Sequence, residues 1–428
     1  MCSLYFCDSI YINPYHTSEQ NIQILGYLGF TKFFRFVGYT KNMKFTDMPA
    51  LYMFLKKTTK GNPLIKSNSE NVFFAFTSKA VEDVLLNKYS SFVKDGLVSR
   101  LKTVMGNGIM TIEEPSHMVN KKEMYPAFSN KIMNEYEKKV VTATDYVISS
   151  WSGEINARRQ MKFLVFKSVV DIFFSENADD EFVKISDDAH ITANKIAWDI
   201  NDEELSRSTK TLKEFCKKLA DKRIESKENK NDFLGMLVNS YNNQKITIDE
   251  LYDQAITIFL TSYKSTSHVL EWALYYLSVN PEWQEKIHEK ENLEAVISEV
   301  LRLCPPIWNT QHLATEDVVV DETLIPAGTK VTTSSYVMHR DKNIFEDPDS
   351  FKPERWLENK ELSKGEYFPF LFGKRQCIGR EFALMEIRVV LTKITEMFKI
   401  ELVTGGEEYL AGLVYAPKNE TIVHVTNK

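Results

Sequence analysis

An unbroken amphipathic pattern runs from Ile246 to Pro281. It opens with Thr247 and Glu250, which have the spacing of a capping box, in which each side chain bonds the other residue's backbone. Apolar side chains, among them Trp272, then repeat along one stripe. Neither glycine nor proline interrupts the segment before Pro281, so the pattern predicts one helix of about thirty residues, well above the usual length.

The pattern of apolar and polar residues along the chain predicts one large α-rich domain over residues 1–428. The stretch from Lys218 to Asn243 is rich in lysine and asparagine and predicts an exposed connection between helices. No Gly/Ser/Pro-rich linker, internal repeat or long low-complexity tract divides the chain. Apolar residues make up 43% of the sequence, which is ample for one large core.

Charge and cysteine content narrow the classes of partner and compartment. A net charge of −6 argues against nucleic acid as a main partner. The five cysteines are odd in number and scattered, which favours a reducing compartment over a disulfide framework.

The first forty residues, 1–40, form an N-terminal segment in which no transmembrane anchor is expected, because no run approaches 18 apolar residues. The start also lacks a basic region followed by a continuous apolar stretch, so no secretory leader is predicted. The aromatic and basic segment from Ile24 to Phe36 could contact a membrane surface, although packing against the domain is favoured. We therefore expect a soluble, cytoplasmic protein, with peripheral membrane contact as the lesser alternative.

The segment from Phe370 to Gly379 is the most informative in the chain. It puts Cys377 in a loop between two glycines, beside Lys374 and Arg375 and just ahead of a helix-like run. Backbone amides aimed at the sulfur, adjacent positive charge and a helix N-terminus all favour a thiolate. A thiolate held in this way is suited to bind haem iron. A buried structural cysteine is the alternative, which this spacing disfavours.

This loop closely resembles that of the cytochrome P-450 family, the haem-thiolate monooxygenases, which reads Phe-x-x-Gly-x-Arg-x-Cys-x-Gly. The matching residues are Phe370, Gly373, Arg375, Cys377 and Gly379. Leu371 departs from the small residue that the family usually has there. The resemblance implies an α+β fold, mainly α with a smaller β-rich region. It also implies that haem b lies between a long distal helix and the cysteine loop, with Cys377 as the iron ligand.

Two further signatures of the family lie upstream. Glu299 and Arg302 form a Glu-x-x-Arg, and residues three apart on a helix can pair. The segment from Phe351 to Trp356 resembles the family's Pro-Glu-Arg segment, whose arginine, here Arg355, joins that pair in a buried triad. Such a triad is better understood as fixing geometry than as adding stability.

The resemblance also implies residues that hold the haem propionates. Arg375 of the loop is one candidate, and His117 with Lys121, one helical turn later, are two more. The family's Arg-x-Ala-Thr segment reads His312-Leu313-Ala314-Thr315 here, so a weaker donor, His312, takes the arginine's place. The nearby strand-and-turn segments from Ile325 to Thr329 and from His339 to Asp341 also match the family.

The centre of the long helix departs from the family. Over the iron the family has Ala/Gly-Gly-x-Asp/Glu-Thr-Thr, where this chain has Thr261-Ser262-Tyr263-Lys264-Ser265-Thr266. The candidate catalytic residues are thus Ser265, Lys264 and Thr266. A protonated lysine cannot accept a proton, whereas Ser265 keeps a hydroxyl that can donate a hydrogen bond.

Three interpretations of Lys264 stay open. It points outward as a solvated or paired lysine while hydroxyls and water carry protons, or it faces the pocket and binds an anionic substrate. In the third, oxygen activation is lost and the protein rearranges a ready-made peroxide.

The activity that the resemblance implies is insertion of one oxygen atom into a C–H or C=C bond of a small apolar substrate. The alternatives are a peroxide-using haem-thiolate enzyme and a haem-binding carrier or gas sensor without catalysis. No flavin or iron–sulfur signature is visible, so electrons come from a separate ferredoxin, flavodoxin or flavin reductase, or from peroxide.

Two surfaces are expected from the same residues. Lys121, Lys122, Lys374 and Arg380 would form a cationic docking face for an acidic electron donor. The loop from Tyr89 to Met105, the helix face near Thr261 and Ser265, and Ile307-Trp308 would line the substrate pocket.

Overall fold

The computed structural model describes residues 48–428 except 60, 67–70, 179, 198–200, 202, 229 and 359–360. The expectations for residues 1–40, including Ile24 to Phe36, lie outside the described residues. Within the described part, no helix is both long and apolar enough to cross a bilayer.

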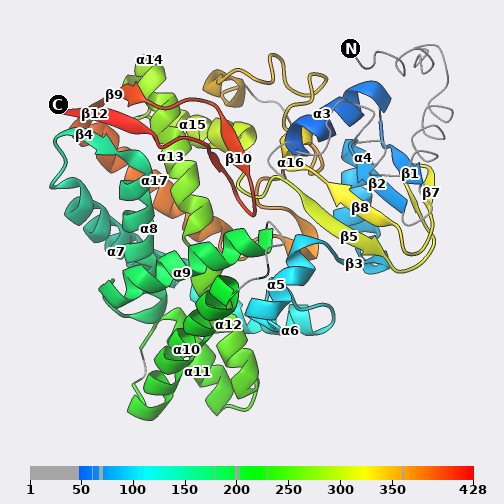
Figure 1. Cartoon of the computed structure of the whole chain (residues 1–428). Helices are drawn as coiled ribbons and strands as arrows, with labels where there is room; N and C mark the ends of the chain where they lie inside the picture. The colour runs from blue at the N-terminus through cyan, green and yellow to red at the C-terminus, as the bar shows by residue number, and fades with distance from the viewer. Residues whose placement is uncertain are drawn as a thin grey trace, which may run out of the picture.

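Helices dominate the structure and form the larger of its two regions, as Figure 1 shows. They are α3 (Met48–Thr59), α4 (Ser78–Glu82), α5 (Leu97–Met105), α6 (Ser116–Met124), α7 (Asn130–Ile148), α8 (Ala157–Phe174), α9 (Asp180–Ala197), α10 (Glu203–Ser226), α11 (Phe233–Asn242), α12 (Ile248–Thr261), α13 (Lys264–Val279), α14 (Pro281–Lys286), α15 (Lys290–Leu303), α16 (Ser335–Met338) and α17 (Arg380–Met397).

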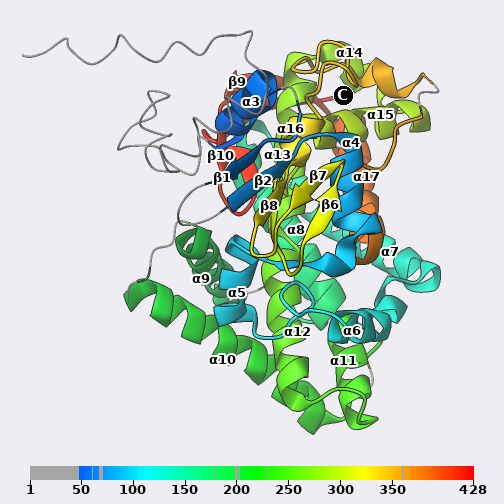
Figure 2. The same cartoon turned by 90° about the vertical axis from the view of Figure 1, so that its right-hand side faces the viewer.

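The strands form small sheets, and the largest lies beside α3 and α4 at one side of the molecule (Figure 2). Its order is β1 (Leu64–Lys66), β2 (Asn71–Ala75), β8 (Lys330–Thr333), β5 (Thr310–Ala314) and β3 (Phe92–Lys94). A second sheet has the order β4 (Gly153–Asn156), β12 (Ile422–Asn427) and β9 (Phe398–Thr404). Two hairpins complete the set: β6 (Val318–Val320) with β7 (Thr323–Ile325), and β10 (Tyr409–Ala411) with β11 (Tyr415–Pro417). This is the expected α+β fold.

The helical core is held together by aromatic side chains that bridge α8 to its neighbours. Phe173 of α8 lies 4.9 Å from Phe382 of α17, measured between ring centroids. Phe166, also on α8, lies 5.4 Å from Tyr263, at the junction of α12 and α13. All four side chains are buried, so α8 fixes both the helix that follows the cysteine loop and the long central pair.

The long helix predicted from Ile246 is two helices. Its start is confirmed, because Thr247 and Glu250 form the expected capping box. However, α12 ends at Thr261 and α13 begins at Lys264, so one continuous helix was the wrong prediction. The hydroxyl of Thr261 bonds back to the carbonyl of Thr257 at 2.8 Å, a contact that weakens and bends helices. Thr257 makes the same kind of bond inside α12 without ending it, so this bond alone does not account for the break.

The exposed connection predicted from Lys218 to Asn243 is also wrong. Helix α10 continues to Ser226, and α11 occupies most of the remainder. Asp232 caps α11 by accepting the Gly235 amide at 2.6 Å, and it pairs with the buried guanidinium of Arg223 at 2.8 Å. Buried apolar residues between the lysines, such as Leu219, make these segments amphipathic rather than loop-like.

Candidate functional site

The cysteine loop is held by backbone hydrogen bonds on both sides of Cys377. The Cys377 amide donates to the Phe370 carbonyl at 2.9 Å, and the Gly379 amide bonds the sulfur. Helix α17 begins directly after Gly379, at Arg380. The Cys377 side chain is exposed, whereas Cys216 and Cys304 are buried. The loop therefore presents one accessible sulfur.

The surroundings of Cys377 act on its pKa in opposite directions. The protein packed around the loop raises the pKa of the thiol, and this is the largest effect. The Gly379 amide, Lys121 and Arg380 each lower the pKa. The amide expected from the sequence is thus present, whereas the cations that act on the sulfur are Lys121 and Arg380 and not the adjacent Lys374 and Arg375. A bound metal would remove the remaining proton.

Lys121 supports the cysteine loop directly. Its ammonium group donates to the carbonyls of Lys374 and Gln376 at 2.7 and 2.8 Å. The side chain is buried, and burial lowers its pKa, against the attraction of Cys377. Two of its three donors therefore serve the loop, whereas the sequence predicted a propionate contact.

The turn before Cys377 forces two left-handed residues. Gly373 has φ +70°, and a Cβ there would lie 2.7 Å from the Leu85 carbonyl, so only glycine fits. Leu371 has φ +55° although it carries a full side chain. Leucine in this conformation is strained by about 1–2 kcal/mol. This strain is the structural consequence of the departure from the family's small residue.

Arg375 lies at the centre of a mixed-charge cluster. Its Nη1 donates to the Ile112 carbonyl at 2.8 Å, its Nη2 pairs with Glu113 at 2.6 Å, and its Nε bonds the Tyr89 hydroxyl. A guanidinium has five N–H donors, so these three contacts leave two N–H groups for another acceptor. Glu113 holds Arg375 where an incoming anion would also bind.

Two histidines beside Arg375 are neutral near pH 7. His117 bonds Glu114 at 3.2 Å, and His312 bonds the Thr310 hydroxyl at 3.0 Å. Burial, followed by the charge of Arg375, lowers the pKa of each to about 4. Both can therefore donate one neutral N–H. Their role toward a propionate stays a prediction.

Sequence reasoning missed a second cation in this cluster. Lys94 lies opposite His312 in the β3–β5 pairing, and its ammonium donates to the Ile112 carbonyl at 3.0 Å. Burial and Arg375 lower the pKa of Lys94 to about 7. A lone lysine on a short strand carries no sequence signal, and only strand register could have revealed it.

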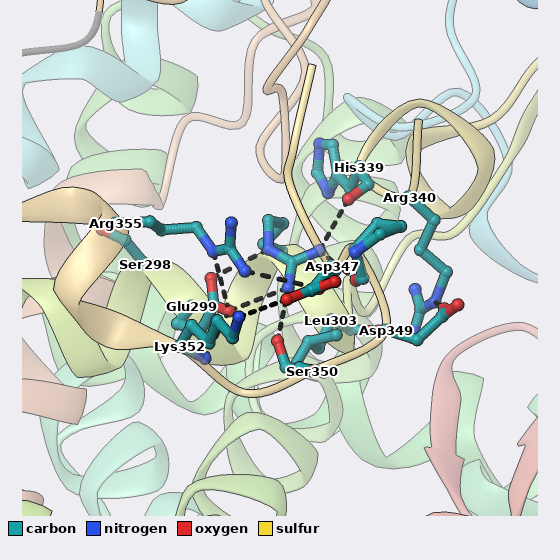
Figure 3. A network of polar contacts seen from close by, with 12 residues as sticks. Ser298, Glu299, Leu303, His339, Arg340, Asp347, Asp349, Ser350, Lys352 and Arg355 are labelled. Carbon is teal, nitrogen blue, oxygen red and sulfur yellow. Dashed lines mark hydrogen bonds and ion pairs between the residues drawn. The ribbon is translucent and has the colours of Figure 1, made fainter. Parts of the chain in front are cut away.

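The Glu-x-x-Arg and Pro-Glu-Arg segments meet as predicted (Figure 3). Arg302 donates to both oxygens of Glu299 at 2.8 Å, and Arg355 donates to one of them at 3.1 Å. The indole of Trp356 also donates to Glu299, at 2.8 Å. Arg302 further bonds the carbonyls of His339, Pro348 and Ser350. The buried triad thus ties α15 to the segment that leads to the cysteine loop.

Comparison with known proteins agrees with this site. The family model described as Cytochrome P450 matches residues 29–411. The chain belongs to the cytochrome P450 family. Proteins of this family are oxidoreductases of the monooxygenase class that bind haem b through a cysteine thiolate.

The similar proteins cover unequal shares of their length. Cytochrome P450 3A6 of Oryctolagus cuniculus is 32% identical over 219 residues, which span 45% of this chain and only 44% of that relative. Cyclooctat-9-en-7-ol 5-monooxygenase of Streptomyces melanosporofaciens is 23% identical over 380 residues, 80% of this chain and 83% of the relative. Cyclooctatin synthase of the same organism is 24% identical over 378 residues, which span 78% of this chain and 82% of that relative.

The residues present fit the haem b of a cytochrome P450. An exposed sulfur that receives one amide hydrogen bond is the ligand that the iron requires. The cluster of Arg375, Lys94, His117 and His312 offers cationic and neutral donors suited to the two propionates.

The distal residues form two faces of the broken helix. Ser265 is half-buried, as are Thr261 and Ser262, whereas Thr266 and Lys264 are buried. The Ser262 hydroxyl is buried without a partner. The outward, solvated interpretation of Lys264 is therefore wrong: its side chain lies inside the protein near Lys162 of α8. Burial is the main cause that lowers its pKa to about 7, far below that of a solvated lysine.

The segment expected to be a pocket loop, from Tyr89 to Met105, contains β3 and α5 instead. It reaches α12 through the two glycines that follow. A Cβ at Gly106 would lie 2.2 Å from the Asp253 carboxylate, and one at Gly108 would lie 1.8 Å from the Thr257 hydroxyl. Trp308, expected in the pocket wall, is buried and donates to the Gly412 carbonyl.

Proposed function

We propose that this P450 inserts one oxygen atom of O2 into an apolar organic substrate, using electrons from a separate redox protein. The exposed sulfur of Cys377, bonded by the Gly379 amide, carries this proposal. Haem, when bound there, supplies the oxygen chemistry, and the protein tunes it through the thiolate and its surroundings. The two Streptomyces relatives, one named for oxygenation of cyclooctat-9-en-7-ol, support an apolar substrate.

The chain's own groups would act at both ends of the site. Lys121 and the Gly379 amide hold the loop and the sulfur in place. Ser265 offers a hydroxyl that can give and receive a proton. Because burial lowers the pKa of Lys264 to about 7, its amine form is accessible near neutral pH and can accept a proton, which a fully charged lysine could not.

The test is spectroscopic first and chemical second. Protein purified with haem is reduced under carbon monoxide, and a thiolate signature is expected that Cys377→Ala abolishes. Substrates are then screened by the spin-state shift and by oxygenated product that depends on reductant. A protein that binds no haem, or a spectrum unchanged in the variant, overturns the proposal.

A peroxide-using enzyme is the second candidate, favoured by the lysine that replaces the family's distal acid at Lys264. The same preparation distinguishes the two, because product formed from peroxide but not from O2 with a reductase would support this alternative. Haem binding without product from either oxidant would indicate a carrier or sensor.

The proposed electron donor docks on the exposed cations of the cysteine side. Lys122, Lys374 and Arg380 are exposed there, whereas Lys121 is buried against the loop and leaves the predicted face. An acidic ferredoxin, flavodoxin or flavin reductase suits this surface. Reduction rates that fall with ionic strength, and fall further in Lys122→Gln, are expected.

A further inference from the structure

One face of α13 carries three ionisable side chains inside the protein. Lys264, His268 and Glu271 lie four and three residues apart and so fall on one side of the helix. Lys264 is 9% exposed, and the side chains of His268 and Glu271 are 14% and 0% exposed. Burying such groups is unfavourable unless they are paired or bonded, so a row of three calls for an explanation.

At its Glu271 end the row is paired with Arg158, a partly exposed cation. Arg158 of α8 donates from Nε to both oxygens of Glu271, at 3.0 and 3.1 Å. The Arg158 side chain is 25% exposed and also bonds the carbonyls of Pro417 and Asn419. Nδ1 of His268 lies 3.5 Å from Glu271 Oε2. Glu271 itself is fully buried, so the row meets solvent at Arg158 and at His268, the two groups that Glu271 contacts.

At its other end the row adjoins Ser265 along the helix. His268 is three residues after Ser265 and four after Lys264, so its ring neighbours both on the helix surface. Burial lowers the pKa of His268, and the Glu271 carboxylate acts against that effect. The charged groups that face the row from the packed element are Lys162 and Arg158, both on α8.

We propose that Glu271, His268 and Lys264 form a proton relay from solvent to the Ser265 hydroxyl, replacing the acid that the family has at the Lys264 position. The proton passes from solvent beside Arg158 to Glu271, from Glu271 to Nδ1 of His268, and from Nε2 to Ser265 Oγ, directly or through one water. Ser265 in turn releases its own hydroxyl proton into the pocket. Lys264 is the other neighbour of the ring. Its ammonium form can donate a proton to the imidazole, and its amine form can accept one from it. No electrons move in these steps, and the inference rests on the proposed monooxygenase function.

The first test needs no turnover. The titrations of Lys264 and His268 are followed by NMR in isotope-labelled, haem-loaded protein, with His268→Gln to assign the imidazole signals. Glu271→Gln is expected to lower the pKa of His268, because a negative neighbour is lost, and Lys264→Gln to raise it. A His268 pKa that is unchanged in both variants would overturn the relay.

The second test is made in turnover, normalised to haem content. His268→Gln and Lys264→Gln are expected to slow product formation about ten-fold or more, to increase peroxide release and to change the pH profile. Lys264→Glu restores a titratable group and is expected to recover most of the rate. Lys139→Gln removes one positive charge from α7, outside the row, and serves as the matched control.

The outcomes separate the two proposals. Wild-type protein that binds haem but oxygenates nothing contradicts the monooxygenase, whereas the NMR coupling is unaffected by that result. Active wild-type protein whose His268→Gln variant has the same rate, peroxide release and pH profile contradicts the relay alone.

Discussion

The cysteine side and the central-helix side of this P450 are built differently. On the cysteine side, charged side chains bond backbone carbonyls of distant segments, as Arg302 does with His339, Pro348 and Ser350. On the helix side, Lys264 and His268 are ionisable groups with lowered pKa values beside a helix break. The first arrangement fixes backbone geometry, and the second leaves Lys264, with a pKa of about 7, able to exchange a proton near neutral pH.

The cysteine loop and the central helix are therefore under different structural constraints. Support of the sulfur depends on the positions of backbone atoms, which few residue types can maintain. Proton transfer requires only titratable groups in series, and many residue types can supply those. The family signature is therefore retained at Cys377 and altered at Lys264.

Glu299→Ala should have the largest effect on stability, and it tests whether the buried pairs fix the geometry of this side. It leaves Arg302 and Arg355 without their carboxylate, and removing one partner of a buried ion pair lowers the free energy of unfolding by about 3–5 kcal/mol. Glu294→Gln, on the same helix, removes a partly exposed pair with Arg388 and should lower it by at most about 1 kcal/mol. Denaturant midpoints of the two variants measure the contrast, and equal losses would contradict it.

Substitution of Lys264 by methionine should have the opposite sign. The pKa of Lys264 falls from 10.5 to about 7 on folding, so the unfolded chain binds more protons between these values. Stability of the wild type therefore rises with pH from about 7 to 10.5. Lys264→Met is expected to raise the free energy of unfolding by up to a few kcal/mol at pH 6, and much less at pH 10.

Denaturation of both proteins across this pH range measures the effect. A destabilised Lys264→Met variant at pH 6 would show that the lysine contributes to folding rather than to proton exchange.

Lys121→Met tests the support that Lys121 gives to the cysteine loop. It removes two hydrogen bonds to the loop carbonyls, and unsatisfied buried acceptors should lower the free energy of unfolding by about 1–3 kcal/mol. Loss of the positive charge should also raise the pKa of Cys377. Alkylation of haem-free protein against pH, with peptide mapping to isolate Cys377, measures the shift. Lys122→Met, an exposed neighbour, should leave both quantities nearly unchanged.

The smallest expected effect concerns strain at Leu371. Both Leu371→Gly and Leu371→Ala remove the side chain, but only glycine adopts φ +55° without strain. The glycine variant should therefore be more stable than the alanine variant by about 1 kcal/mol. Thermal unfolding of the pair measures this difference, and equal stabilities would mean that the loop relaxes.

Much of the fold and part of the site could be predicted from the sequence. The Cys377 loop and the Glu299–Arg302 pair are encoded by closely spaced residue types, whereas Arg355, 56 positions away, was placed with that pair by the resemblance to the family. The start of α12 was predictable because the Thr247 and Glu250 contacts are local.

Other features depend on tertiary contacts that no spacing reveals. The bonds of Lys121 to Lys374 and Gln376 join residues more than 250 positions apart. The break after Thr261 lies in a segment without glycine or proline, so no residue type marks it in the sequence. The burial of Lys264 depends on where α8 packs.

The two bonds of Lys121 have a mechanical consequence. They couple α6, which also carries the exposed Lys122, to the backbone on both sides of Arg375. A protein that docks on α6 and displaces it would therefore shift the segment that presents the sulfur. Displacement of α6 would in this way reach Cys377 through the carbonyls of Lys374 and Gln376.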